Sequence, residues 1–244
     1  MYHFFVTADQ VRENSIIIEG SDVNHMKSVL RLKKGEQISV SDGNNRVYLC
    51  EIEDYPEDKA ALKILSETVG ENELPAKLYL FQGIPKGDKL ELIVQKSVEL
   101  GAFRVIPVAM KRCVAKIEPK KEEAKLRRLS AISESAAKQS GRNIIPEVGP
   151  CMTLKEAVAF AKTLDRILLP YELAEDMEKT REIIGSVKPG ESIGIFIGPE
   201  GGFDKEEAVL LQEAGAETIT LGPRILRTET APLAILSVLM FLLS

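Results

Sequence analysis

Short hydrophobic runs separated by turn residues fill the first 70 residues of the chain. The runs are rich in β-branched residues, and the breaks include Gly20, Gly35 and Asp42-Gly43-Asn44. This pattern is typical of β-strands, and it predicts strands over residues 15–19, 37–41, 46–52 and 60–67. One helix is expected from Ser21 or Asp22 to Arg31. The first segment therefore reads as a small β-rich, barrel-like module.

The pattern changes after the polar segment from Gly70 to Pro75, where we place a boundary between domains 1–72 and 73–244. Beyond it, predicted strands alternate with predicted helices, which favours a mostly parallel sheet covered on both faces. The expected strands are 77–82, 104–108, 165–169, 192–197 and 218–221. The expected helices are 88–100, 120–139, 153–161, 179–186, 205–214 and 231–243.

Composition restricts the class of protein. The chain has 244 residues, 44% hydrophobic and 28% charged, which is ordinary for one large or two unequal globular domains. The apolar run 231–243 is shorter than the ~20 residues that cross a bilayer, and the first residues lack the features of a signal peptide. We therefore expect a cytoplasmic protein with no membrane segment.

Metal and disulfide chemistry have little support in the sequence. Cys50, Cys113 and Cys151 are widely separated and form no CxxC pair, and His3 and His25 are the only histidines. No metal is expected. The net charge is −5, yet residues 86–142 contain 14 basic and 7 acidic side chains. This basic segment is either a surface that follows nucleic-acid phosphates or a solvated helix face.

The segment Gly198-Pro199-Glu200-Gly201-Gly202 follows a predicted strand, where open α/β sheets bind ligands. Asp204 and Glu207 form a capping box that explains the next helix start. The three glycines have two interpretations: a site where a ligand approaches the main chain closely, or a tight strand-to-helix turn.

A second loop, residues 222–230, lies between the last expected strand and the terminal helix. Arg224 and Arg227 are guanidinium groups suited to phosphate or carbonyl oxygens. Thr228 and Thr230 are candidate N-caps, and Glu229 would stand at the positive end of the helix dipole. No Walker A, GxGxxG or GxSxG motif is present, so the sequence gives no support for a kinase, a dehydrogenase or an α/β-hydrolase.

The two loops together resemble the signature of the ribosomal RNA small subunit methyltransferase E family, which are 16S rRNA uridine-N3 methyltransferases of the SPOUT superfamily. The matching segments are 197–203 and 221–231. The similarity extends to residues 25–31, 95–101 and 138–142, and so covers nearly the whole chain. One departure is His3, which stands where many relatives have Arg.

The resemblance implies a PUA-like RNA-binding β-barrel followed by an α/β SPOUT domain with a trefoil knot, in a homodimer. It also implies S-adenosylmethionine as cofactor and 16S rRNA or the small ribosomal subunit as partner. The expected cofactor-binding residues lie in or beside the two loops: Leu169, Ile197, Gly198, Pro199, Glu200, Gly202, Leu221, Gly222, Ile225, Leu226 and Thr230.

Methylation of uridine N3 requires an unpaired base and loss of a proton. Arg224 or Arg227 would stabilise the resulting charge, and Glu229 or Glu200 would accept the proton or orient an arginine. The expected phosphate contacts are Arg31, Lys86, Lys89, Arg112 and Arg142. Two alternatives stay open: a knotted methyltransferase acting on tRNA or a ribose 2′-hydroxyl, and a non-catalytic RNA-binding assembly factor.

Overall fold

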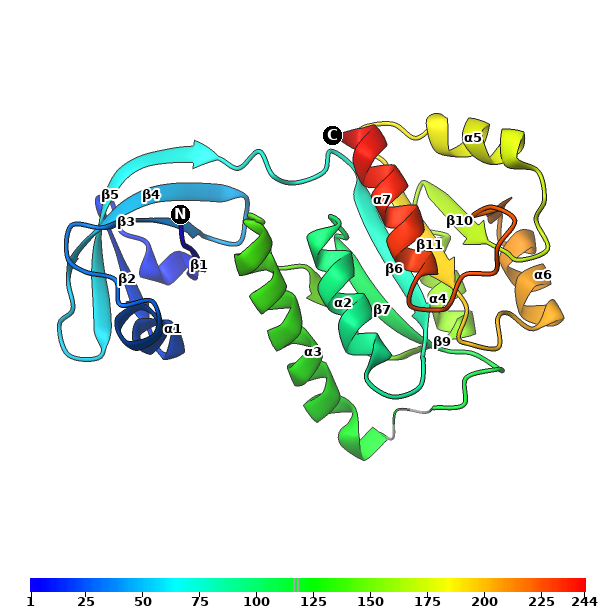
Figure 1. Ribbon diagram of the computed structural model, residues 1–244, viewed down its shortest axis with the longest axis horizontal. Coiled ribbons are helices and arrows are strands. Elements are labelled where there is room, and N and C mark those ends of the chain that lie inside the picture. Colours follow the sequence, from blue (N-terminus) through cyan, green and yellow to red (C-terminus); the bar gives the residue numbers. More distant parts are fainter. Residues whose placement is uncertain (116, 118) are drawn as a thin grey trace. The chain divides into compact units, whose positions relative to one another are not determined.

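The computed structural model describes residues 1–244 except residues 116 and 118. Its chain forms two compact units (Figure 1). The N-terminal unit contains residues 1–73 and 137–145, and the C-terminal unit contains residues 74–136 and 146–244. The sequence pattern did not indicate that residues 137–145 belong to the N-terminal unit.

The N-terminal unit is built on a five-stranded sheet with the order β1-β3-β4-β5-β2. Its strands are β1 (His3–Phe5), β2 (Ser15–Glu19), β3 (Gln37–Ser41), β4 (Arg46–Asp54) and β5 (Lys59–Val69). A short 3₁₀ helix, η1 (Ala8–Gln10), joins β1 to β2. The four predicted strands are confirmed, and β1 was missed because three residues are too few to show a period.

The predicted helix at residues 21–31 is confirmed in its position and start, but it ends at Val29 and its second half is not α-helical. A single α-turn, α1 (Ser21–Asn24), continues into a π-helix, η2 (His25–Val29). The N–H of Leu32 then reaches back to the carbonyl of Met26 at 2.9 Å. This bond requires Arg31 in the left-handed region at φ +56°, which ends the helix before Arg31.

Residues 137–145 pack into the N-terminal unit through polar contacts. The Arg142 guanidinium is paired with Glu73, with Nε 3.1 Å from Oε2. The Ser41 hydroxyl donates to the carbonyl of Asn143 at 2.6 Å. Because Arg142 is only 4% exposed, this charge pair is an internal part of the unit.

The C-terminal unit contains a sheet with the order β12-β10-β11-β6-β7-β8, with β9 paired to β7. All of these pairs are parallel, as predicted. The strands are β6 (Lys77–Gly83), β7 (Arg104–Ala109), β8 (Glu147–Val148), β9 (Met152–Thr153), β10 (Arg166–Pro170), β11 (Ser192–Ile197) and β12 (Glu217–Ile219). The last strand is therefore shorter than the predicted 218–221, and residues 220 and 221 belong to the following loop.

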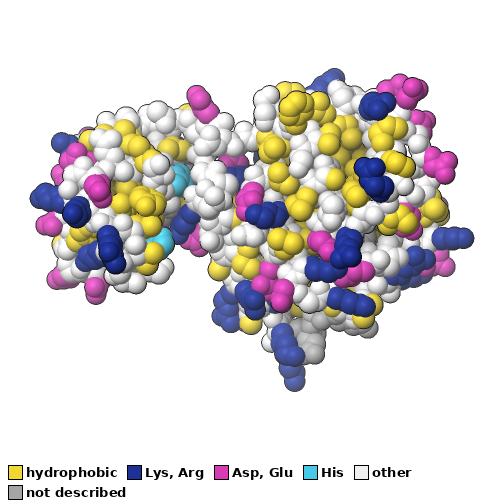
Figure 2. Space-filling model, in the orientation of Figure 1, with side chains coloured by type: hydrophobic (Ala, Val, Ile, Leu, Met, Phe, Trp, Pro, Cys, Tyr) yellow, Lys and Arg dark blue, Asp and Glu magenta, His cyan; other side chains and the backbone are white. Residues whose placement is uncertain are grey.

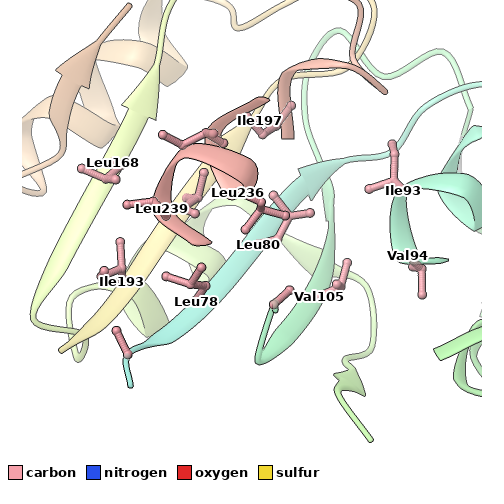
Figure 3. Packing of buried hydrophobic residues seen from close by; sticks show 14 of the residues in the cluster. Leu78, Leu80, Ile93, Val94, Val105, Leu168, Ile193, Ile197, Leu236 and Leu239 are labelled. Carbon is pink, nitrogen blue, oxygen red and sulfur yellow. The ribbon is translucent and has the colours of Figure 1, made fainter. Parts of the chain in front are cut away.

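Six helices accompany the described part of this sheet: α2 (Lys89–Glu99), α3 (Pro119–Ser140), α4 (Leu154–Ala161), α5 (Met177–Gly185), α6 (Lys205–Glu213) and α7 (Ala231–Leu243). Alternate strand residues point to opposite faces. Leu78 and Leu80 of β6 pack with Leu236 and Leu239 of α7 (Figure 3). Phe81, the next residue after Leu80, packs on the other face with residues of α4 and α6. Because both faces of the sheet are buried, the sequences of these strands are continuous runs of apolar residues.

No helix among the described residues is long and apolar enough to span a membrane. The same residues contain no group of three or more His, Cys, Asp or Glu side chains placed to hold a metal ion.

Candidate functional site

Loops from the carboxyl ends of neighbouring parallel strands enclose a cavity of about 710 Å³ in the C-terminal unit. They follow β10, β11 and β12, and the side chain of Lys89 at the start of α2 completes the lining. The two loops singled out in the sequence thus lie together, as the parallel topology requires. Their lining residues are Ile197, Gly198, Pro199, Glu200, Gly202, Phe203, Thr220, Leu221, Gly222, Pro223, Arg224, Ile225, Leu226, Arg227 and Thr228.

The glycine loop, residues 198–202, is both a tight turn and a wall of the cavity. A Cβ atom added to Gly198 would lie 3.0 Å from the carbonyl carbon of Gly202, and Gly202 itself has φ +66°. Glycine is therefore required for the turn. The predicted capping box of Asp204 and Glu207 is confirmed, and it starts α6 directly behind this wall.

The second loop presents main-chain donors and cations. Within the described part of the chain, no hydrogen bond uses the main-chain N–H groups of Leu221, Ile225 and Leu226. Arg224 and Arg227 are exposed, and no carboxylate among the described residues lies within 4.0 Å of either guanidinium. The loop therefore offers N–H donors and two positive charges to a ligand.

Lys89 joins three segments of the site. Its Nζ lies 3.0 Å from Oε2 of Glu229 and 3.3 Å from Oε1 of Glu200. Glu200 Oε1 also accepts the main-chain N–H of Lys86 at 3.0 Å. The sequence suggested that Lys89 contacts phosphate, but in the structure its partners are two carboxylates of the site.

These contacts set the charge states of the site. The hydrogen bond to Glu229 raises the pKa of Lys89 above its ordinary value. Burial alone would raise the pKa of Glu229, but its own main-chain N–H and the Lys89 ammonium together hold that pKa below its ordinary value. Burial opposes ionisation of Glu200 as well, and the Lys86 N–H and Lys89 outweigh it, so its pKa is also lowered. Both carboxylates are therefore ionised at neutral pH and are weak bases.

Three of the expected cofactor or catalytic residues do not line the cavity. Leu169 is fully buried in the apolar core, and its neighbour Pro170 takes the place in the lining. Glu229 reaches the site through Lys89. Thr230 occupies the N-cap position of α7 without a side-chain capping bond, and Thr228 donates its hydrogen to the carbonyl of Gly198 instead of capping the helix.

Sequence reasoning missed the third wall, which is the loop after β10. Pro170, Tyr171, Glu172, Ala174, Glu175 and Met177 line the cavity from this side. The available signal was topological: the loop follows a predicted strand of the same parallel sheet, and ligands bind at the carboxyl ends of such strands.

The remaining candidates for phosphate contacts are divided between the units. In the C-terminal unit, Arg112 donates from Nη1 to the carbonyl of Gly201 at 2.9 Å, on the glycine loop. Lys86 precedes α2, and its main-chain N–H donates to Oε1 of Glu200 in the glycine loop. In the N-terminal unit, Arg31 is exposed, whereas Arg142 is buried against Glu73.

Comparisons with known proteins agree with this architecture. Residues 72–240 match the family model of an RNA methyltransferase domain, and residues 18–65 match that of an RNA methyltransferase PUA domain. The chain is 36% identical to ribosomal RNA small subunit methyltransferase E of Bacillus subtilis, covering 98% of this chain and 95% of the relative. It is 35% identical to the enzyme of that name from Mesomycoplasma hyopneumoniae, covering 97% and 98%.

A solved structure extends the comparison to three dimensions. Ribosomal RNA small subunit methyltransferase E from Neisseria gonorrhoeae, bound to S-adenosyl methionine, superposes with a TM-score of 0.84 at 32% identity. The match covers 99% of this chain and 98% of that one.

Proposed function

Because this chain belongs to the ribosomal RNA small subunit methyltransferase E family, we propose that it uses S-adenosylmethionine to methylate N3 of a uridine in 16S rRNA. The observation that carries the proposal is the cavity at the strand ends, lined by the glycine loop and by the second loop with its unused main-chain N–H groups. The signature segments 197–203 and 221–231 form these two walls.

The residues present fit S-adenosylmethionine. The volume of about 710 Å³ lies within the range of small-molecule sites. The N–H groups of Leu221, Ile225 and Leu226 suit the nitrogen acceptors of an adenine ring, and Ile197, with Leu221, supplies apolar surface for its faces. The bound cofactor supplies a methyl group on a cationic sulfur, so that methyl transfer needs no metal.

Arg224 and Arg227 are the groups proposed to act on the target base. Loss of the N3 proton spreads negative charge over the two uracil carbonyl oxygens, and an exposed guanidinium is a suitable donor to them. Neither guanidinium has a carboxylate of the described chain within 4.0 Å, so both can donate to RNA.

Glu200 and Glu229 are proposed to orient the site and not to take the proton. Both carboxylates contact Lys89, and their lowered pKa values make them weak acceptors for an imide proton. In this mechanism the proton leaves to solvent, while Lys89 holds the glycine loop, through Glu200, against the second loop, which carries Arg224 and Arg227.

Ribosomal RNA binding is assigned to the PUA-type N-terminal unit together with basic side chains beside the cavity. Arg31 is exposed after the π-helix, and Arg112 and Lys86 flank the glycine loop. Arg142 and Lys89 do not belong to the proposed RNA surface, because each is already paired with carboxylate. Since the substrate is ribosomal RNA, the cytoplasm is the proposed compartment.

We propose that the protein is a homodimer and that its C-terminal segment is threaded as a trefoil knot. Support for the dimer comes from α7, where Val238, Phe241 and Leu242 are exposed and hydrophobic side chains gather near the helix end (Figure 2). Analytical ultracentrifugation of Phe241→Glu beside the wild type tests this: a monomeric variant supports it, and a monomeric wild type contradicts it.

Nucleoside mass spectrometry tests the reaction. Small ribosomal subunits and tRNA from a strain lacking this protein are incubated with the purified protein and S-adenosylmethionine. Formation of 3-methyluridine in 16S rRNA alone is the expected result. A 2′-O-methylated nucleoside or modified tRNA would identify another knotted methyltransferase. No product, with no calorimetric binding of S-adenosylmethionine, would favour the non-catalytic assembly factor.

A further inference from the structure

A buried chain of hydrogen bonds joins three segments at the cavity. Nε2 of Gln82, near the end of β6, donates to Oγ1 of Thr228 at 3.0 Å. Thr228 Oγ1 donates in turn to the carbonyl oxygen of Gly198 at 2.7 Å. Gln82 is fully buried and Thr228 is 5% exposed. Thr228 and Gly198 line the cavity, whereas Gln82 stands behind them.

The direction of every hydrogen in this chain is fixed by chemistry. A carbonyl oxygen only accepts, so the single hydrogen of the Thr228 hydroxyl must point at Gly198. The hydroxyl oxygen must then accept, which requires the NH₂ group of Gln82 to face it. The same NH₂ group also donates to the carbonyl of Gly83 at 3.0 Å. Oε1 of Gln82 has no partner among the described residues, so the amide is held by its NH₂ group.

Direct packing links the same strand end to the glycine loop. A Cβ atom added to Gly83 would lie 2.7 Å from both N and Cδ of Pro199. The end of β6 therefore touches the glycine loop at Pro199 and is hydrogen-bonded, through Thr228, to the carbonyl of the preceding residue. The strand end is thus packed on the glycine loop at Pro199, and the Thr228 hydrogen bond joins the second loop to the glycine loop at the wall of the cavity.

We propose that Gln82 and Thr228 are positioning residues that hold the two cofactor loops in their binding arrangement before the cofactor arrives. The proposal rests on the proposed function, since it concerns the same cavity. A substitution that destabilises the free and the bound protein equally leaves the affinity for the cofactor unchanged. A substitution that lowers the fraction of free protein with its loops in the binding arrangement weakens binding, because the apparent Kd is the intrinsic Kd divided by that fraction.

The test is calorimetric titration of S-adenosylmethionine into Thr228→Val, Thr228→Ser and Gln82→Met, beside thermal unfolding. Valine has the shape of threonine but removes the hydroxyl that donates to the Gly198 carbonyl and accepts from the Gln82 NH₂ group, and losing partners of buried polar groups is costly. We expect the Kd of Thr228→Val and of Gln82→Met to rise about tenfold or more. Thr228→Ser keeps the hydroxyl, and its Kd should stay within about threefold of the wild type.

Ser133→Ala is the matched control in the same unit. Ser133 is fully buried and its hydroxyl donates to the carbonyl of Pro146 at 2.6 Å, away from the cavity. This variant should lose stability but keep the wild-type Kd. The proposal is overturned if Thr228→Val and Gln82→Met bind like the wild type, or if Ser133→Ala weakens binding equally. A wild-type protein that binds no S-adenosylmethionine would refute the proposed function itself.

Discussion

The ammonium nitrogen of Lys89 lies 3.0 Å from Oε2 of Glu229, and the same nitrogen lies 3.3 Å from Glu200. The start of α2, the glycine loop and the start of α7 therefore meet at one positive charge. Without that charge, two ionised carboxylates at the cavity would repel each other. Lys89 is thus the cation that allows these three segments to come together.

Lys89→Met should lower the single-turnover rate of methylation by about tenfold or more, through misplacement of a loop that carries Arg227. The melting temperature should change little, because the Lys89 side chain is one-third exposed and ion pairs open to solvent add little to stability. Lys96→Met is the control, since Lys96 pairs with Glu99 along the same helix. Equal rates for the two variants would contradict the positioning role of Lys89.

Glu229 should contribute stability that depends on pH. Its pKa is lowered in the folded protein from an ordinary value of 4.5. A lowered pKa means that the ionised form stabilises the fold above pH 4.5, and that this contribution disappears as the pH falls through the lowered value. Urea unfolding of the wild type and Glu229→Gln should therefore differ at pH 7, and the difference should shrink as the pH falls below 4.5. A constant difference across this range would show that Glu229 acts sterically.

The position of the site was predictable from the sequence, but its internal contacts were not. Alternation of strands and helices predicted a parallel sheet, and the loops at its strand ends had to converge. The partners of Lys89 lie more than a hundred residues further along the chain, so its local sequence showed only a cation at a helix start. Arg142 was similar: a basic residue after a basic helix gave no sign of its burial against Glu73.

Steric substitution in the glycine loop should weaken cofactor binding. Gly198→Val places side-chain atoms against the main chain of Gly202, where even a Cβ lies 3.0 Å from the carbonyl carbon. The loop must shift, and the Kd for S-adenosylmethionine measured by calorimetry should rise at least about tenfold. Gly185→Ala is the control, because no atom lies within 4 Å of its added Cβ. Unchanged affinity in a folded Gly198→Val variant would exclude the loop from the binding site.

Charge reversal in the N-terminal unit should weaken RNA binding in a salt-dependent way. Arg31→Glu removes an exposed cation at the end of the π-helix, so the affinity for 16S rRNA should fall and its salt slope should flatten by about one unit. Lys155→Glu, an exposed site on α4, makes the same change in net charge. Filter binding at several salt concentrations compares the two. If both variants lose the same affinity for 16S rRNA, the effect of Arg31→Glu comes from net charge alone and Arg31 is not a specific RNA contact.

Arg227→Ala and Glu229→Gln should separate chemistry from binding. Arg227 lines the cavity, is exposed and has no carboxylate within 4.0 Å among the described residues, which leaves its guanidinium available to the target base. Removing a positioned charged group from such a site typically lowers the rate by about 10² to 10³. Glu229 acts on the base only through Lys89 and the loop, so Glu229→Gln should lower turnover less than Arg227→Ala does.

Single-turnover methylation at saturating S-adenosylmethionine, measured beside thermal unfolding, decides between these roles. Cofactor affinity should be nearly unchanged in Arg227→Ala, since the N–H donors of Leu221 and Leu226 are main-chain groups that the substitution leaves in place. A rate for Arg227→Ala close to that of the wild type would remove it from the catalytic residues. If Glu229→Gln instead loses about 1 kcal/mol of stability and keeps its turnover, its carboxylate serves only the start of α7.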